Sequence, residues 1–282
     1  MLDLFMKLFY DSIEYRFFLL FIVGSCIGSF INVVVYRLPI MLEKTWRQDA
    51  LDILGQPQEK TTRFNLLVPA SSCPKCKSKI KVITNIPILG YFISKGRCLV
   101  CGEKISLRYP LVEFSIAVLF AVCAFKFHNF DLLFAQIVII IIVSTLILID
   151  YDTYLLPDQL TIVLVWLGLL INLNSVFVSI ESSVLGAVAG YLSLWLIYWI
   201  FKLITKKEGM GYGDFKLFAA IGACFGVNAL FPIVILASLS GSVIGVLLII
   251  NKKINRDKPI PFGPFLGIAA LIYLFYPVNF FS

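Results

Sequence analysis

The chain is poor in two things that most soluble enzymes have in quantity, histidine and charge. It holds one histidine, His128, and only 15% of its 282 residues are charged. A single histidine excludes HExxH zinc hydrolases and any centre with several histidine ligands. Soluble domains are about 25% charged and roughly 45–50% apolar. A chain that is 60% hydrophobic is therefore neither an ordinary soluble domain nor disordered, and it is identified as an integral membrane protein.

Long apolar runs are abundant. Since a transmembrane helix needs about 20 mainly apolar residues, the sequence predicts an all-α polytopic protein with about eight spans, at residues 17–36, 110–127, 132–149, 160–177, 183–203, 215–230, 232–250 and 262–279. We expect short connections between some of them, including a turn at Pro232. The chain is accordingly divided into a first span (1–36), an extramembrane domain (37–108) and a seven-helix membrane domain (109–282).

Positive charge is concentrated on one side of the predicted bundle. The net charge is +7, and 21 of the 24 Lys and Arg residues fall in three segments, namely 37–108, 202–216 and the loop before the last span. Thirteen of them lie in 37–108 alone. Basic residues stay cytoplasmic in short loops. We therefore expect both termini outside, and residues 37–108 in the cytoplasm.

Four cysteines in the extramembrane domain form two CxxC pairs, Cys73–Cys76 and Cys98–Cys101, with 21 residues between the pairs. This spacing predicts a four-thiolate zinc site with a structural role, because four protein ligands leave no open position for water. Disulfides or free thiols are the alternative, and a reducing cytoplasm disfavours disulfides. The other cysteines lie in apolar runs and are predicted to be small buried hydrophobes: Cys26, Cys123 and Cys224.

Lysines and arginines crowd the two cysteine pairs. A basic zinc domain can bind nucleic acid, but a basic face beside a helix end also suits anionic lipid headgroups. We favour the lipid bilayer as the partner and predict no nucleic acid.

Acidic residues gather at the predicted cytoplasmic ends of two spans. The third span ends near Asp150, and the sixth opens with Gly211-Tyr212-Gly213-Asp214. Ionisable residues at such positions are functional candidates, and two close carboxylates can share a proton and activate water, as in aspartic proteases. The glycines allow a peptide strand to approach closely. Helix capping explains Asp158 and Asp214 equally well, but not Asp150 at a helix C-terminus.

These residues resemble the bifunctional type IV prepilin peptidases, which are membrane aspartic proteases of the GxGD type. The GxGD motif is extended by Lys216, and Asp150 precedes Pro157-Asp158 as in the family's first catalytic region. Lys95 and Gly90 are small departures, where Arg and Ser are usual. Further matches cover nearly the whole chain: Gly24, Gly28-Ser29-Phe30, Asn32, Tyr36-Arg37-Leu38-Pro39, Glu43, Trp46, Asn85-Ile86-Pro87, Gly96-Arg97-Cys98, Arg108-Tyr109-Pro110, Glu113 and Pro261-Phe262-Gly263-Pro264.

The resemblance implies a peptidase and a methyltransferase in one chain. The substrates would be type IV prepilins and pseudopilins, cut after a glycine at the cytoplasmic face of the bacterial inner membrane, and the new N-terminal residue would be methylated with S-adenosylmethionine. The family's catalytic pair corresponds to Asp150 and Asp214, with support from Gly211, Gly213, Lys216 and Asp158. The methyltransferase candidates rest on the family alone, because the chain has no dinucleotide-type glycine motif: Gly96, Asn32 and Arg37.

Three alternatives stay open at this stage. The chain could be a peptidase without methyltransferase activity. A transporter or channel would carry acids along its pathway and show inverted repeats, whereas the acids here cluster at one face. A zinc-anchored scaffold would leave the two aspartates without a purpose.

Overall fold

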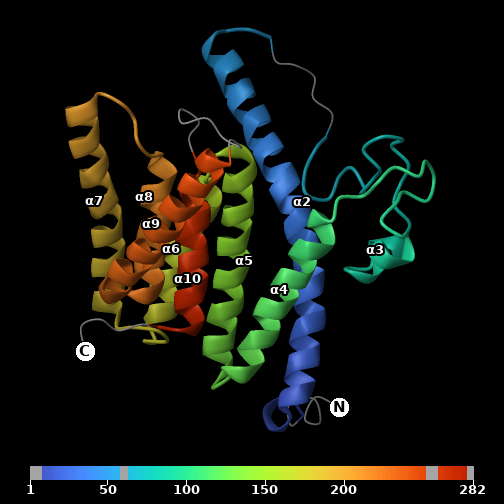
Figure 1. Ribbon diagram of the computed structural model, residues 1–282, viewed down its shortest axis with the longest axis horizontal. Helices are drawn as coiled ribbons and strands as arrows, with labels where there is room; N and C mark the ends of the chain where they lie inside the picture. Colours follow the sequence, from blue (N-terminus) through green and yellow to red (C-terminus); the bar gives the residue numbers. More distant parts are fainter. Residues whose placement is uncertain (1–7, 58–62, 252–259, 278–282) are drawn as a thin grey trace. The chain divides into compact units, whose positions relative to one another are not determined.

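The computed structural model describes residues 8–57, 63–251 and 260–277, and within them the regular structure is helical, without a named strand. The residues form two compact units, Met1–Lys126 and Phe127–Ser282. Eight helices of 13 residues or more correspond to the eight predicted spans, so the predicted all-α membrane fold is confirmed (Figure 1). The basic residues at 7, 60 and 252–258 lie outside the described residues.

The first unit is built on two antiparallel helices, α2 (Ile13–Ile53) and α4 (Arg108–Phe125). Two glycines one turn apart on α2 allow this close contact. A Cβ atom at Gly24 would lie 2.9 Å from the Cα of Ala117, and one at Gly28 would lie 2.7 Å from the Cα of Glu113. Small residues spaced in this way let helices pack closely in lipid. The sequence prediction grouped residues 109–127 with the later helices, whereas α4 packs on α2.

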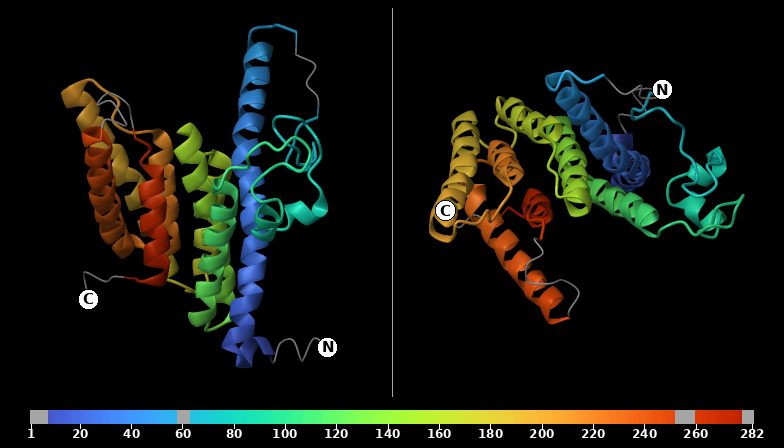
Figure 2. Two further views of the ribbon diagram at one scale, coloured as in Figure 1. Left: turned by 45° about the vertical axis from the view of Figure 1, so that its right-hand side comes forward. Right: turned by 90° about the horizontal axis from the view of Figure 1, so that it is seen from above.

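Helix α2 continues well beyond the predicted first span. Its 41 residues correspond to about 60 Å at 1.5 Å per residue, roughly twice the hydrocarbon thickness of a bilayer. It extends past the end of α4 (Figure 2). The predicted helix end at residue 36 is therefore wrong: Arg37 marks the end of the apolar run, while the helix runs on through Pro39 to Ile53.

The cysteine-containing segment joins these two helices. It has little regular structure, namely the short 3₁₀ helix η1 (Val82–Asn85) and the five-residue helix α3 (Leu89–Ile93). Arg37 is buried and holds the start of this segment, because its guanidinium donates hydrogen bonds to the carbonyls of Asn65, Leu66 and Pro69.

The second unit is a bundle of six helices, with α8 at its centre and the other five around it. Helix α8 packs against four others and, from Asp214 to Phe225, only Lys216 is not buried. Small residues permit this close packing, because the backbone of Gly222 in α8 is in direct contact with that of Gly186 in α7. The six helices are α5 (Phe130–Thr153), α6 (Asp158–Asn172), α7 (Ile180–Thr205), α8 (Tyr212–Phe225), α9 (Val227–Ile250) and α10 (Gly263–Phe275).

A buried polar residue ties three of these helices together. The Asn172 side chain, at the end of α6, is fully buried and donates to the carbonyls of Ala223 and Cys224 in α8 at 3.0 and 2.9 Å. Its oxygen accepts the N–H groups of Phe177 and Val178, just before α7. Because a buried amide is stable only when its hydrogen bonds are satisfied, this network fixes the C-terminal end of α8.

Some helix boundaries differ from the prediction. Helices α6, α8 and α10 have 15, 14 and 13 residues, fewer than the about 17 that the shortest ordinary spans need. The predicted turn at Pro232 is wrong, because Pro232 lies inside α9. The chain turns instead at Gly226, whose φ of 79° suits glycine far better than any residue with a Cβ atom.

Candidate active site and metal centre

The two predicted catalytic acids lie at helix ends in the second unit. Asp150 is in the last turn of α5, and Asp214 is in the first turn of α8. Both side chains are buried, with 5% and 7% of their surface exposed. Their carboxyl groups are close enough to interact electrostatically. The structure therefore brings together two acids that are far apart in the sequence.

Asp214 also caps its own helix. Its Oδ2 accepts a hydrogen bond from the N–H of Gly211 at 3.2 Å, which is the geometry of a capping box at the start of α8. The sequence left capping open as an alternative explanation of this acid. Capping does occur, with Asp214 as the third residue of the helix, and it engages one of the two carboxylate oxygens.

The start of α10 reaches the same place. A Cβ atom at Gly263 would lie 2.5 Å from Oδ2 of Asp150, closer than side chains tolerate. The Asp150 Oδ2 atom is buried and has no hydrogen-bond partner among the residues that the structure describes. Gly213 and Gly263 both approach Leu156, with a Cβ at these positions lying 2.8 and 3.2 Å from its side chain. The contact between Gly263 and Asp150 was not predicted, because nothing in the local sequence reports it.

Two further predicted residues form an ion pair beside the acids. The Lys216 ammonium group contacts both carboxylate oxygens of Asp158, at 2.6 and 2.8 Å, and joins α8 to the first residue of α6. About half of the Asp158 side chain is exposed, so the pair is worth only about 0.2–1 kcal/mol. Asp158 is therefore engaged by a lysine, whereas neither Asp150 nor Asp214 has a basic partner among the described residues.

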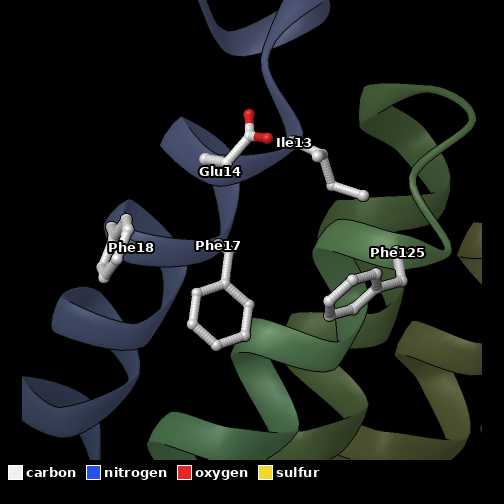
Figure 3. Close-up of a pocket in the computed structure, with 5 residues that line it drawn as sticks. All are labelled: Ile13, Glu14, Phe17, Phe18 and Phe125. Atoms are coloured by element: carbon white, nitrogen blue, oxygen red, sulfur yellow. The ribbon is translucent and has the colours of Figure 1, made fainter.

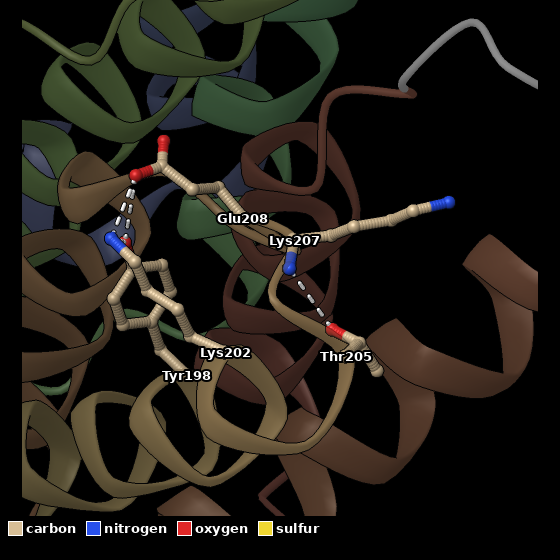
Figure 4. Close-up of polar contacts among 5 residues, drawn as sticks. All are labelled: Tyr198, Lys202, Thr205, Lys207 and Glu208. Carbon is tan, nitrogen blue, oxygen red and sulfur yellow. Dashed lines mark hydrogen bonds and ion pairs between the residues drawn. The ribbon is translucent and has the colours of Figure 1, made fainter.

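The loop before the GxGD motif is held by a cluster that sequence reasoning missed. Glu208 accepts hydrogen bonds from Lys202 at 2.8 Å and from the buried Tyr198 hydroxyl at 3.4 Å (Figure 4). The Lys202 hydrogen bond lowers the pKa of the Glu208 carboxyl. The Tyr198 ring also packs on those of Tyr212 and Phe215, the neighbours of Asp214. The cluster thus fixes the loop that leads from α7 into α8.

The four cysteines of the two CxxC pairs converge as predicted. Their sulfur atoms all lie within 4.8 Å of one another. The Sγ atoms of Cys73 and Cys101 are 3.7 Å apart, and those of Cys76 and Cys98 are 3.9 Å apart. A zinc ion with four Zn–S bonds of about 2.3 Å requires sulfur–sulfur edges of about 3.8 Å, whereas a disulfide bond is about 2.05 Å long. The distances are compatible with a tetrahedral zinc site, and the four cysteines are free thiols rather than disulfides in the structure.

The two cysteine pairs are held by the same backbone turn used twice. In the first, the N–H of Lys77 bonds to the carbonyl of Cys73 at 2.9 Å, and in the second Gly102 bonds to Cys98 at the same distance. Lys77 and Gly102, each four residues after the first cysteine of its pair, both have positive φ angles, 58° and 72°. The repeated turn presents two sulfurs from each side of the centre.

At two of the four cysteines, local hydrogen bonds favour the thiolate, the form that binds metal. The N–H groups of Cys101 and Val100 lower the pKa of the Cys98 thiol to about 6. Ser78 Oγ lies 2.9 Å from the Cys76 sulfur and lowers the pKa of that thiol. An exposed ion pair at 2.5 Å, Lys75 with Glu103, links the two turns.

The three methyltransferase candidates have structural partners of their own. Asn32 donates to the carbonyl of Tyr109 at 3.2 Å, and Arg37 is occupied by the three carbonyls described above. Gly96 has a φ of 65° and packs against the Tyr91 ring. Each contacts a different segment, so these contacts do not bring the three candidates into one site.

A shallow depression between α2 and α4 carries no chemistry of its own. It is lined by four apolar side chains and one acid, and the Phe17 and Phe125 rings meet edge to face at 5.8 Å (Figure 3). A single acid among aromatic rings offers no set of metal or substrate ligands. It is part of the apolar surface of the helix pair.

Comparison with known proteins matches both halves of the chain. Residues 22–127 match the bacterial peptidase A24 N-terminal domain, and residues 137–246 match the type IV leader peptidase family. A protein of Aeromonas salmonicida named prepilin leader peptidase/N-methyltransferase is 47% identical over 263 residues, which cover 92% of this chain and 90% of that protein. Relatives with the same name in Pseudomonas putida and Dichelobacter nodosus are each 45% identical, covering 89% of this chain and 87% and 88% of theirs. No solved structure gives a significant match.

Proposed function

The chain belongs to the type IV leader peptidase family, and we propose that it removes the N-terminal leader of type IV prepilins and pseudopilins by aspartic catalysis. Cleavage occurs after a glycine, and the enzyme then methylates the new N-terminal residue. The observation that carries the peptidase proposal is the buried acid pair, Asp150 and Asp214, to which three helices contribute.

The acid pair can hydrolyse a peptide bond with its own atoms. One ionised carboxylate takes a proton from water while the water oxygen attacks the scissile carbonyl carbon, and the protonated carboxyl gives its proton to the carbonyl oxygen. In the tetrahedral intermediate, the carboxyl that took the water proton passes it to the nitrogen and the C–N bond breaks. The other carboxylate takes a proton from one hydroxyl group as the product carboxyl forms, which restores the pair. The unpartnered Oδ2 of Asp150 supports this proposal, because a buried acceptor requires a partner and water or the substrate provides one.

The surroundings of the acids suit an extended peptide. Gly211 and Gly213 keep side chains away from the start of α8, and Gly263 does the same beside Asp150. Lys216, paired with Asp158, and the Glu208 cluster hold α6 and the loop in place around the pair. These residues position the catalytic acids and take no part in the proton transfers.

The four cysteines are proposed to hold one structural zinc ion. A closed thiolate site supplies folding free energy and no open coordination position. S-adenosylmethionine is proposed as methyl donor on the strength of the relatives' name. Asn32, Arg37 and Gly96 remain candidates, although the described contacts of Asn32 and Arg37 are with backbone carbonyls.

We propose an orientation with both termini outside and the acid pair facing the cytoplasm, in the bacterial inner membrane. The distribution of basic residues supports it. In this orientation the enzyme meets the basic leader of its substrate on the side where prepilins are synthesised.

The test is cleavage of a prepilin by purified Asp150→Asn and Asp214→Asn enzymes. Each substitution keeps the side-chain volume and removes the ionisable group, and we expect cleavage to be lost. Asp131→Asn, at the opposite end of α5 and exposed, is the matched control and should cleave normally. Cleavage near the normal rate by either site variant contradicts the proposal, provided that the variant unfolds at the same temperature as the control.

A further inference from the structure

The segment between the two cysteine pairs exposes an unusual number of large apolar side chains. Residues 82–93, which we call the interfacial segment, include η1 and α3. Val82 is 87% exposed, Phe92 is 68% exposed and Leu89 is 59% exposed, and Ile83 and Ile93 are also exposed. Clusters of exposed apolar side chains are rare on domains surrounded by water and mark interaction surfaces.

The depth of this segment along the helices explains its exposed apolar side chains. The N–H of Ile88 donates to Oε2 of the buried Glu113 at 2.6 Å. Glu113 lies five residues inside α4, about 7 Å from its start, and α4 is a candidate membrane span. Gly28, which packs on Glu113, lies eight residues before the end of the predicted first span, about 12 Å inside it. The interfacial segment therefore lies beside membrane-embedded parts of α2 and α4.

The backbone of the segment is suited to lipid. Peptide groups in a bilayer must find partners within the protein, because lipid chains offer none. The N–H of Ile88 is taken by Glu113, and those of Leu89, Gly90 and Tyr91 bond to the carbonyls of Pro87, Ile86 and Ile88. The turn into α3 thus exposes apolar side chains without leaving these peptide donors unsatisfied.

The charge around the segment suits an anionic surface. Residues 63–102 contain seven Lys and Arg and no acid, and Lys79, Lys81 and Lys95 flank the segment and are exposed. Anionic lipids attract such residues, and lysine stems can lie along the apolar layer with the charge at the headgroups. Leu111 and Phe114, on either side of Glu113 in α4, are 60% and 50% exposed, so the part of α4 that bonds to the segment also exposes apolar side chains.

We infer that the interfacial segment is a membrane anchor, which inserts the side chains of Val82, Leu89, Phe92 and their neighbours into the leaflet on the side of the basic loops. The occupant of this surface is the acyl-chain and headgroup boundary of an anionic bilayer. The anchor fixes the cysteine centre at the membrane surface. The inference rests on the depth, exposure and charge of the segment, and it stands independently of the peptidase mechanism.

The experiment compares two tryptophan variants of the full-length protein in vesicles of phosphatidylcholine and phosphatidylglycerol, with and without brominated acyl chains. Phe92→Trp places the probe in the segment. Ile53→Trp is the matched control, because Ile53 is apolar, 85% exposed and at the far end of α2, about 24 Å beyond Arg37. The signal is the fluorescence that each variant adds to that of the four native tryptophans.

Bromine should quench most of the fluorescence added by Phe92→Trp and leave that of Ile53→Trp nearly unchanged. Introducing Lys79→Glu and Lys81→Glu into the Phe92→Trp protein should reduce the quenching, because the charges no longer match the lipid. Unquenched fluorescence from Phe92→Trp overturns the inference, whether the probe is in water or covered by another part of the protein. Quenching that the charge reversals leave unchanged overturns the role of the lysines.

Discussion

The cysteine centre and the acid site are assembled in opposite ways. The cysteine centre comes from one segment, in which the same turn is used twice and four sulfurs meet within 4.8 Å. The acid site is contributed by the end of α5, the start of α8 and the start of α10, which meet only because the helices pack closely. The first is compatible with a metal ion held by four sulfurs, and the second depends on the absence of side chains at Gly213 and Gly263.

The largest effect on structure should follow from removing two of the four cysteines that are proposed to bind zinc. Cys73→Ser combined with Cys98→Ser should reduce bound zinc from about one ion per chain to none, because two thiolates cannot form a closed site. Residues 63–107 should then become sensitive to protease, since metal binding supplies much of the folding free energy of such small domains. Metal analysis and limited proteolysis measure both.

The same experiment tests whether the two sites are independent. Cys26→Ser with Cys123→Ser changes two cysteines outside the centre and should keep the zinc. Prepilin cleavage by the Cys73→Ser, Cys98→Ser enzyme should stay well above that of Asp214→Asn. A wild-type protein without zinc would refute the metal assignment, and cleavage as low as that of Asp214→Asn would refute the independence of the sites.

A smaller effect is expected from one methyl group beside Asp150. Gly263→Ala places a Cβ atom 2.5 Å from the Asp150 carboxylate, which must move. Because displacing a reacting group by about 1 Å can cost on the order of 100-fold in rate, kcat for cleavage should fall about 10- to 100-fold. Gly241→Ala is the control, as its nearest side-chain atom is 3.4 Å away. Equal rates for the two variants would show that α10 does not confine the acid.

The smallest effect is expected at the ion pair between α6 and α8. Asp158→Asn removes an interaction worth about 0.2–1 kcal/mol, so the unfolding temperature should fall by about 1–3 °C and cleavage should stay within about 3-fold of normal. Adding Lys216→Met to the Asp158→Asn protein should lower the unfolding temperature little further, since the ion pair is already broken. A loss of cleavage as deep as that of Asp214→Asn would make Asp158 a catalytic residue and contradict the division of roles.

The sequence was most informative where function depends on short-range patterns. The CxxC pairs, the apolar runs and the GxGD motif each predict a local structure, and the predicted convergence of the four cysteines is confirmed. The closeness of Asp150 and Asp214 was inferred from shared topology. Contacts between distant segments were not predicted, such as Gly263 with Asp150, Asn172 with α8, and Ile88 with Glu113. Such contacts depend on how helices pack, which periodicity does not report.

The most direct test of the account asks whether the two aspartates act as one unit. Rates of prepilin cleavage should be measured for Asp150→Asn, Asp214→Asn and the double variant. Residues that share a proton fail together, so each single variant should lose at least about 1,000-fold and the double variant should lose no more. Losses that multiply in the double variant, or substantial cleavage by either single variant, would contradict the claim that Asp150 and Asp214 form the catalytic pair.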